Sequence, residues 1–266
     1  MDFSLSEDQL AFLDVAREFA QKQLAPYAAE WDEQKIFPVE TLRAAGALGF
    51  CGMYCPEQLG GTGLSRMDAA LLLEELAQGC TSTAAYISIH NMAAWMVATW
   101  GSADVQAQWL GDLAAGRKFA SYCLTEANAG SDAASIKTSA QRFADHYVIN
   151  GTKAFISGAG DTDVLVVMAR TGGSGPGGIS AFVVPSDTPG VSFGKNETKM
   201  GWNSQATRAI TFEDARIPAV NRLGDEGEGF AIAMRGLEGG RINIAACSLG
   251  AAQATLDMSQ RYLGER

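Results

Sequence analysis

The segment Tyr122-Cys-Leu-Thr-Glu-Ala-Asn-Ala-Gly-Ser-Asp132 lies where the hydrophobic pattern of the chain changes its period. Before it, apolar residues recur at the spacing of amphipathic helices. After it, they form short runs rich in β-branched and aromatic residues. The segment passes from a strand-like stretch into small and hydrogen-bonding residues, among them Gly130, where a ligand could approach the backbone closely. By composition alone it is a polar loop with a turn.

The residues before this segment predict a helical domain. Ser6-Glu-Asp-Gln9 has the form of a capping box, and Ser65-Arg-Met-Asp68 caps a second amphipathic run in the same way. Residues 82–100 are apolar nearly all round, so we expect that helix to be buried between others. Further helices are expected from Pro38 and over about 103–115, with glycines at their ends.

The residues after the segment predict short strands separated by Gly, Pro, Asn and Asp clusters. Asn150-Gly151 stands between two of these runs and predicts a tight hairpin there. Short strands without intervening helices favour an antiparallel barrel or sandwich over a doubly wound sheet. The expected strands are Phe119–Thr125, Tyr147–Ile149, Lys153–Ser157, Val164–Ala169, Ile179–Val184, Val191–Phe193 and Ala209–Phe212.

Helical periodicity returns at Gly229, through Phe230–Leu237 and then Ile242–Leu263, and reaches Arg266 without a Gly or Pro stop signal. The predicted fold is therefore an α+β multidomain chain. It consists of an N-terminal helical domain (1–117), a central antiparallel β-barrel or sandwich domain (118–225), and the beginning of a C-terminal helical bundle (226–266).

Composition limits the possible functions. The 266 residues include 30 acidic and 20 basic side chains, a formal net charge of −10. Such a surface repels phosphate backbones and lacks the basic clusters that bind anionic membranes, so we expect no nucleic-acid or membrane partner. The first residues do not resemble a signal peptide, and no apolar stretch approaches the roughly 18–20 residues of a spanning helix. With five irregularly spaced cysteines, expected as reduced thiols, these features predict a cytoplasmic protein.

Two sequence features match the residue types of known sites but lack the neighbours that those sites need. Gly173-Ser-Gly-Pro-Gly-Gly178 matches the spacing of a dinucleotide-binding loop, but it contains Pro176 and leads into a strand where that site needs a helix. We expect a flexible turn between strands. His90 and His146 stand alone, so neither a metal site nor a Ser-His-Asp triad is expected.

The boundary segment resembles the flavin-binding signature of the acyl-CoA dehydrogenase family, and other landmarks of that family follow in order. Asn150–Ser157 resembles the hairpin whose aromatic-Ile-Thr/Ser end contacts the flavin. Lys199–Trp202 and Ile210–Pro218 resemble the strands that close the β domain. Gly224–Phe230 and Gly236–Arg241 resemble the entry to the C-terminal helices. The resemblance covers the whole chain, and the run Gly236–Ala252 is most similar to the isobutyryl-CoA (short branched-chain) members.

The resemblance implies a bound FAD. Phe155 would lie against the ring where many relatives carry Trp, and Thr125 and Ser157 would supply hydrogen bonds that stabilise charge developing on it. Gly130 and Ser131 would meet the pyrophosphate or the pantetheine of the substrate, whereas Asp132 could equally orient the loop. The implied cofactor residues are Tyr122, Leu124, Thr125, Gly130, Ser131, Phe155, Ile156 and Ser157.

The resemblance also implies an acyl-CoA site formed by Ser131, Glu238, Gly239, Gly240 and Arg241, in which the two glycines leave room beside a branched acyl chain. Removal of the α-proton needs a carboxylate. In most of the family it lies beyond the position of residue 266, and in a minority it occupies the position of Gly240, where glycine cannot serve. Glu238 is roughly 200° away around a helix and should point elsewhere, and Glu126 is expected to be structural.

The activity that the resemblance implies is FAD-dependent α,β-dehydrogenation of a short branched acyl-CoA to the 2-enoyl-CoA, with electrons passed to electron transfer flavoprotein. A homotetramer is typical of the family, and its members continue beyond Tyr262–Arg266, so we expect this chain to be a fragment. The alternatives are a flavin oxidase that returns electrons to oxygen, or a truncated protein that binds FAD or acyl-CoA without turnover.

Overall fold

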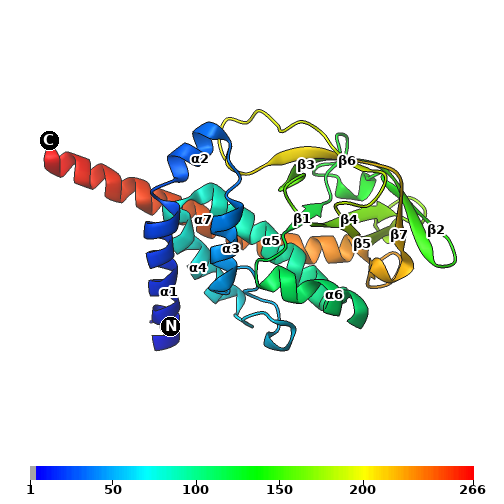
Figure 1. The fold of residues 1–266 in the computed structure, drawn as a ribbon, viewed down its shortest axis with the longest axis horizontal. Coiled ribbons are helices and arrows are strands. Elements are labelled where there is room, and N and C mark those ends of the chain that lie inside the picture. The colour runs from blue at the N-terminus through cyan, green and yellow to red at the C-terminus, as the bar shows by residue number, and fades with distance from the viewer. Residues whose placement is uncertain (1–3) are drawn as a thin grey trace.

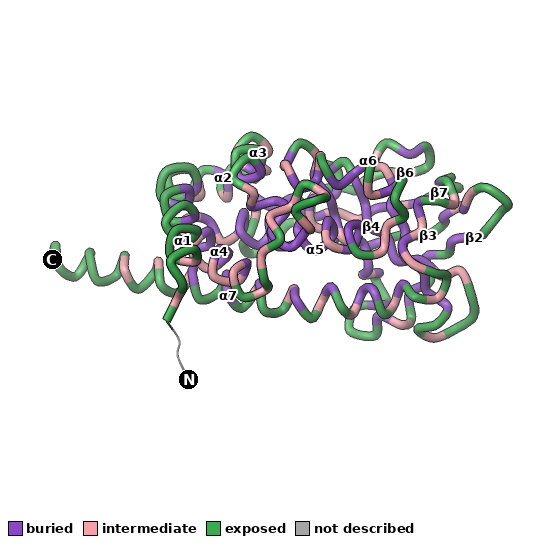
Figure 2. The backbone as a smooth tube through the Cα atoms, turned by 90° about the horizontal axis from the view of Figure 1, so that it is seen from below, coloured by how far each residue is buried: buried purple, intermediate pink, exposed green. Residues whose placement is uncertain are grey.

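The computed structural model of the protein describes residues 4–266. A group of helices packs beside a β-sheet, and one long helix, α7 (Gly229–Glu265), runs along both (Figures 1 and 2). The predicted order of helices, strands and a final helix is confirmed.

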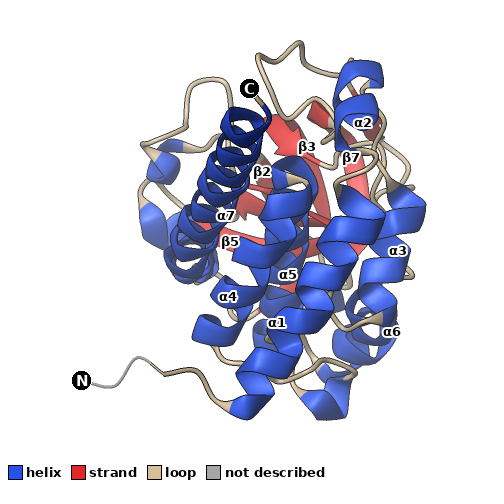
Figure 3. Cartoon of the chain, turned by 90° about the vertical axis from the view of Figure 1, so that its left-hand side faces the viewer, coloured by secondary structure: helices blue, strands red, loops and turns tan. Residues whose placement is uncertain are grey.

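The N-terminal helices pack around α5 (Thr81–Trp100), which contacts α4, α6, α7 and the first strand. Most of the side chains of α5 are buried, as its all-round apolar sequence predicts. Figure 3 shows this helical layer in front of the sheet. The other helices are α1 (Glu7–Phe19), continued by a π-helical turn (Ala20–Leu24), then α2 (Ala28–Gln34), α3 (Val39–Ala47), α4 (Arg66–Gly79) and α6 (Ala103–Ala114).

Both predicted helix starts are confirmed. The Ser6 hydroxyl accepts from the Gln9 amide at 3.2 Å and the Gln9 side chain accepts from the Ser6 amide at 3.0 Å. Ser65 and Asp68 form the same reciprocal pair at the start of α4. These short-range hydrogen bonds satisfy amides that the first turn of a helix leaves free, so the local sequence suffices to predict them.

The sheet is mixed and open, which corrects the expectation of an antiparallel barrel or sandwich. Along its main path the order is β6-β7-β3-β2-β4-β5-β8. Among the described residues the two edge strands, β6 and β8, do not pair with each other, so the sheet does not close into a barrel. β1 pairs with β4 in parallel, and a parallel bridge joins β2 to β4. The strands are β1 (Ala120–Cys123), β2 (Ser139–Arg142), β3 (His146–Ser157), β4 (Val164–Arg170), β5 (Ile179–Pro185), β6 (Val191–Phe193), β7 (Thr207–Pro218) and β8 (Arg222–Leu223).

The hairpin predicted at Asn150-Gly151 is wrong, because β3 runs straight through both residues. The register against β7 shifts between Ile149 and Gly151, and the Asn150 side chain bonds both the amide and the carboxylate of Asp214 on β7. Gly151 has a φ of 143°, and a Cβ there would lie 2.6 Å from the Cα of Thr138. Asn150 on β3 therefore lies opposite two residues of β7, Glu213 and Asp214, so the bulge is in β7 and the dipeptide continues β3.

α7 is one continuous helix, whereas the sequence suggests two runs separated by glycines. Other glycines within these runs permit close packing: a Cβ on Gly236 would lie 2.1 Å from Met96 Cε, and one on Gly250 would lie 2.0 Å from the Glu74 carbonyl oxygen. The end of α7 projects from the body in Figure 1. None of the helices in residues 4–266 is long and apolar enough to cross a membrane. All five cysteines are free and buried.

Candidate functional site

The structure joins the two cofactor segments that the sequence predicts. β1 leads into Leu124 and Thr125, and the Ala154 amide of β3 donates to the Thr125 carbonyl at 2.9 Å. At the beginning of β1 and the end of β3, the Ser121 hydroxyl donates to the Ser157 carbonyl at 2.7 Å. The two segments are thus fixed side by side by one backbone and one side-chain hydrogen bond.

Phe155 has the most unusual conformation in this region. Its φ is +57°, in the left-handed region that aromatic residues rarely adopt, and it lies where the register of β3 against β7 shifts between Lys153 and Ile156. Phe155 is 64% exposed, while the next residue, Ile156, is buried. Such strain costs of order 1–3 kcal/mol and persists where the surrounding structure enforces it, often at a binding site. The bulge therefore turns an aromatic face outward beside Thr125.

Tyr122 supplies a polar atom without a partner. Its ring packs against an apolar cluster that contains Leu124, and its hydroxyl is buried with no hydrogen-bond partner in the described chain. Burial raises the pKa of Tyr122 well above its usual value, so the hydroxyl stays protonated and can donate. Leu124 has its side chain in the same cluster, so only its backbone could face a ligand.

The small polar residues of the loop are open to ligands. The hydroxyls of Thr125, Ser131 and Ser157 form no hydrogen bond with residues 4–266, and a Cβ added to Gly130 would meet nothing within 4 Å. Asp132 is engaged: its carboxylate accepts from the Ser135 hydroxyl and its carbonyl from the Ser135 amide. Of the two roles considered for Asp132, the structure favours orientation of the loop.

Lys153 and Glu126 form a buried pair that the sequence analysis missed. The Lys153 side chain is fully buried, and its ammonium donates to Glu126 Oε1 at 2.8 Å and to the Leu124 carbonyl at 2.9 Å. The interpretation of Glu126 as structural is supported. The signal was available, because Tyr147, Ile149 and Lys153 fall on alternate positions of one strand face. The predicted hairpin interrupted that alternation and hid it.

The predicted substrate residues lie on α7 and face different environments. Glu238 and Arg241 are exposed, and Arg241 makes one weak contact, to the Leu237 carbonyl at 3.4 Å. A Cβ on Gly240 would have only Met92 Sδ nearby, at 3.6 Å, so space is open at that position. Met92 and Leu237 belong to the same apolar region as Tyr122 and Leu124, which relates this part of α7 to the cofactor segments.

Arg66, also missed, lies against Gly239. A Cβ on Gly239 would be 2.3 Å from Arg66 Nη1, and the guanidinium packs 4.1 Å from the Tyr54 ring centre and 4.6 Å from that of Trp95. Arg66 Nη1 is buried without a partner. A basic residue in the first turn of a helix opposes the helix dipole, and this is the sequence signal that could have marked it.

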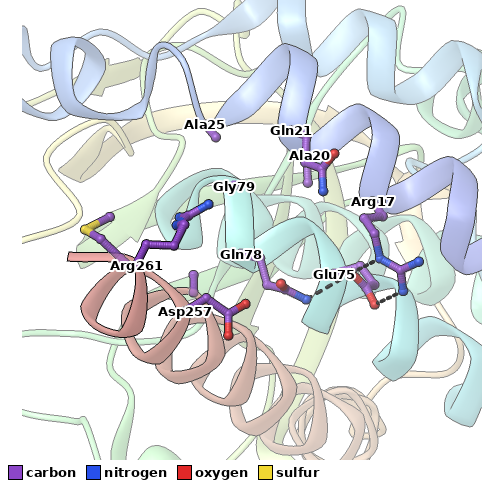
Figure 4. A pocket seen from close by; sticks show the side chains of 11 residues that line it. Arg17, Ala20, Gln21, Ala25, Glu75, Gln78, Gly79, Asp257 and Arg261 are labelled. Atoms are coloured by element: carbon purple, nitrogen blue, oxygen red, sulfur yellow. Dashed lines mark hydrogen bonds and ion pairs between the residues drawn. The ribbon is translucent and has the colours of Figure 1, made fainter. Parts of the chain in front are cut away.

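Other candidates are excluded by their contacts. The two nitrogens of His90 are used by the Leu113 carbonyl and the Ala120 amide, and burial lowers its pKa to about 4. No cluster of metal ligands exists within residues 4–266. The Gly173–Gly178 stretch is a turn between β4 and β5, as predicted. A hollow of about 460 Å³ between α1, α4 and α7 lies on the helical side of the molecule, away from the sheet (Figure 4).

A helical layer, an open sheet carrying these two joined segments and a long shared helix define the acyl-CoA dehydrogenase fold. Sequence models of three domains of acyl-CoA dehydrogenase match the chain: the N-terminal domain over residues 6–117, the middle domain over 121–215 and the C-terminal domain over 227–266. The chain belongs to the acyl-CoA dehydrogenase family.

Individual relatives agree with this assignment. Isobutyryl-CoA dehydrogenase of Bos taurus is 56% identical over 98% of the chain, and that of Dictyostelium discoideum is 53% identical over 98%. The structure of butyryl-CoA dehydrogenase from Megasphaera elsdenii superimposes with a TM-score of 0.95 at 38% identity, covering 100% of this chain and 71% of that one. The chain spans 63% of the length of each of the two isobutyryl-CoA dehydrogenases.

Proposed function

We propose that these residues form the cofactor-binding part, and one wall of the acyl pocket, of an FAD-dependent dehydrogenase for a short branched acyl-CoA. The observation that carries the proposal is Phe155, an exposed aromatic side chain held in a strained conformation next to the residue whose amide bonds the Thr125 carbonyl. The printed names of the isobutyryl-CoA relatives support the substrate.

The residues present suit a flavin. The Phe155 ring offers a flat apolar surface for a conjugated ring system, and the free hydroxyls of Thr125 and Ser157 lie on the two segments that flank it. Gly130 and Ser131 form an exposed loop tip that a pyrophosphate or pantetheine could approach. When bound, FAD would supply the hydride acceptor. Leu124 and Ile156 would contribute through their backbones, because their side chains are buried.

The chain's own part in the reaction is to bind, orient and polarise. Donors fixed by β1 and β3 before the substrate arrives stabilise negative charge on the cofactor without having to reorganise. Gly240 leaves space on the pocket side of α7 for a methyl branch, whereas an added side chain would fill it. Arg241 and Glu238, both exposed, are available to contact the polar part of the substrate.

The α-proton needs a carboxylate, and Glu126 is already occupied by Lys153 and by the Lys137 and Thr138 amides. We propose that the base is supplied from outside residues 1–266, by sequence that the longer relatives also contain. Electron transfer flavoprotein as acceptor, a homotetrameric assembly and a cytoplasmic location complete the proposal.

The test uses the intact natural protein, whose mass is measured first. Extracted cofactor is identified chromatographically, and anaerobic flavin bleaching is followed with isobutyryl-, 2-methylbutyryl-, butyryl- and octanoyl-CoA. We expect FAD and fastest reduction by isobutyryl-CoA. Fastest reduction by octanoyl-CoA would contradict the branched substrate, and peroxide release in air without an added acceptor would favour an oxidase. Bleaching by a chain of 28.0 kDa would show that the base lies within these residues.

A further inference from the structure

The loop that connects β1 to β2 carries several of the candidate cofactor residues, and buried charges hold both of its ends. At its beginning, the Lys153 ammonium donates to the Leu124 carbonyl and to Glu126. At its far end, the same Glu126 carboxylate accepts from the Lys137 amide at 2.7 Å and the Thr138 amide at 2.9 Å. One ion pair therefore closes the loop on itself and attaches it to β3.

The hydrogen bonds of this pair favour the charged forms of both side chains, so the ion pair holds the loop continuously. Burial raises the pKa of Glu126, but hydrogen bonds from Lys153, Lys137 and Thr138 together outweigh it, and the pKa lies below its usual value. Burial lowers the pKa of Lys153, and Glu126 opposes that shift. A buried charge is tolerated when its partners satisfy it, and removal of one partner leaves the other uncompensated.

The position of Lys153 connects this clamp to the strained aromatic residue. The next amide, Ala154, holds the Thr125 carbonyl, and the residue after that is Phe155 at the bulge. A change in the Lys153 side chain would shift the backbone on both sides of it. Thr125 and Phe155 would then move relative to each other, while the sheet beyond them keeps its register.

We propose that Lys153 and Glu126 are positioning residues, which set the relative placement of Thr125 and Phe155 for the flavin ring. This inference rests on the proposed FAD site and adds two residues to it that touch neither cofactor nor substrate. Because the contacts are internal to the chain, the clamp forms before the cofactor binds, so the site is preorganised.

Arg170 also anchors the loop between β1 and β2, but at a place further from Thr125 than the Lys153–Glu126 pair. Its guanidinium donates to the Ala134 carbonyl at 2.7 Å and the Ile136 carbonyl at 3.0 Å, near the far end of the same loop, and also to the Gly173 and Gly175 carbonyls. It binds the loop well beyond Thr125. Arg170→Met should therefore weaken cofactor binding without altering the surroundings of the ring.

The experiment compares Lys153→Met, Glu126→Gln, Arg170→Met and a control, Arg222→Met, in the intact natural protein purified with its flavin. Arg222 is a partly buried cation of the same sheet that bonds the Gly224 carbonyl and the Tyr147 hydroxyl, at the opposite end of β3 from Phe155. The readouts are the visible absorption bands of the bound flavin, the dissociation constant for FAD after its removal, and the thermal midpoint.

We expect Lys153→Met and Glu126→Gln to shift the absorption bands and to weaken FAD binding about tenfold or more, whereas Lys153→Arg restores most of both. Arg170→Met should weaken binding with unchanged bands, and Arg222→Met should change binding less than twofold. If Lys153→Met does not fold, the flavin absorption bands of the near-isosteric Glu126→Gln variant test the inference alone.

Two results would contradict different claims. A lower thermal midpoint with wild-type bands and affinity in both pair variants would show that the pair is structural only, and would overturn this inference. A wild-type protein that neither retains nor rebinds FAD would overturn the proposed function itself.

Discussion

The turn between β4 and β5 and the packed part of α7 both contain glycine at short intervals, yet the two regions use it for different reasons. In the turn, Gly173, Gly175 and Gly177 have nothing within 4 Å of the position that a Cβ would take. In α7, Gly239 and Gly250 lie against other parts of the molecule at 2.0–2.3 Å from that position. The turn needs the backbone freedom of glycine at Gly175, and the helix needs the absence of a side chain.

This difference between the turn and α7 shows that glycines can match the spacing of a binding motif without forming the binding site. The turn has the spacing of a dinucleotide-binding loop, but it leads into the strand β5 instead of a helix. Its Gly173 and Gly175 carbonyls accept hydrogen bonds from Arg170. The glycines of α7 match no loop motif, and one of them, Gly240, leaves the space that we assign to the substrate. Alanine substitutions separate the two uses, and the following predictions run from the largest expected effect to the smallest.

Gly250→Ala should be the most damaging of these substitutions. Its Cβ would lie 2.0 Å from the Glu74 carbonyl oxygen, a backbone atom of α4 that cannot move without the helix. Overpacking of this kind exceeds the gain in helix propensity, and we expect a loss of about 3 kcal/mol in the free energy of unfolding. Urea denaturation measures it. A loss below about 0.5 kcal/mol would show that α4 and α7 are not closely packed.

Gly175→Ala should follow, for a conformational reason alone. Gly175 has a φ of +86° and a ψ near 180°, a region that essentially only glycine occupies. We expect a loss of about 2 kcal/mol by urea denaturation. Equal stability with the wild type would mean that the turn has another conformation in solution.

The adjacent pair Gly239→Ala and Gly240→Ala should have opposite effects. Alanine at 239 meets Arg66 Nη1 at 2.3 Å and displaces it from Tyr54 and Trp95, whereas alanine at 240 meets only Met92 Sδ at 3.6 Å. We expect a loss of about 1 kcal/mol at 239 and a gain of up to about 1 kcal/mol at 240 from helix propensity.

The same pair sharpens the proposed substrate. Gly240→Ala, although stable, should slow flavin reduction by isobutyryl-CoA more than by butyryl-CoA, because the added methyl group occupies the space for the branch. The ratio of the two anaerobic rates is the measurement. An unchanged ratio would remove Gly240 from the acyl pocket.

Gly173→Ala is the matched control in the turn and should have the smallest effect. Nothing lies within 4 Å of its Cβ position and its φ is not positive, so neither crowding nor strain applies. We expect a change within about 0.5 kcal/mol, as for other exposed surface substitutions. A larger loss would indicate that the turn contacts something that this structure does not contain.

Features that depend on neighbouring residues in the chain could be predicted. The capping boxes at Ser6 and Ser65, the buried helix α5 and the strand Val191–Phe193 all follow from local pattern. The cofactor residues could be named from motif resemblance, and the structure brings Thr125 and Phe155 together. Their roles stay predictions.

Features that depend on residues far apart in the sequence could not be predicted. Asn150-Gly151 has the sequence of a tight turn, but it continues β3, where Asn150 bonds Asp214 in a bulge of β7 and Gly151 lies against Thr138. The parallel pairing of β1 with β4 depends on where the helical layer delivers β1, which no short-range pattern encodes. Strand alternation places Lys153 on the buried face of β3, but its pairing with Glu126 depends on residues far apart in the sequence.

The sequence by itself determined the family and the order of helices and strands, because local periodicity and motif spacing carry that information. Only the tertiary structure decided that the sheet is mixed and open, that α7 is a single helix, and that a buried ion pair anchors the loop between β1 and β2. The physical reason is that hydrogen bonds between distant strands, close approach at glycines and the pairing of buried charges require elements far apart in sequence to meet in space.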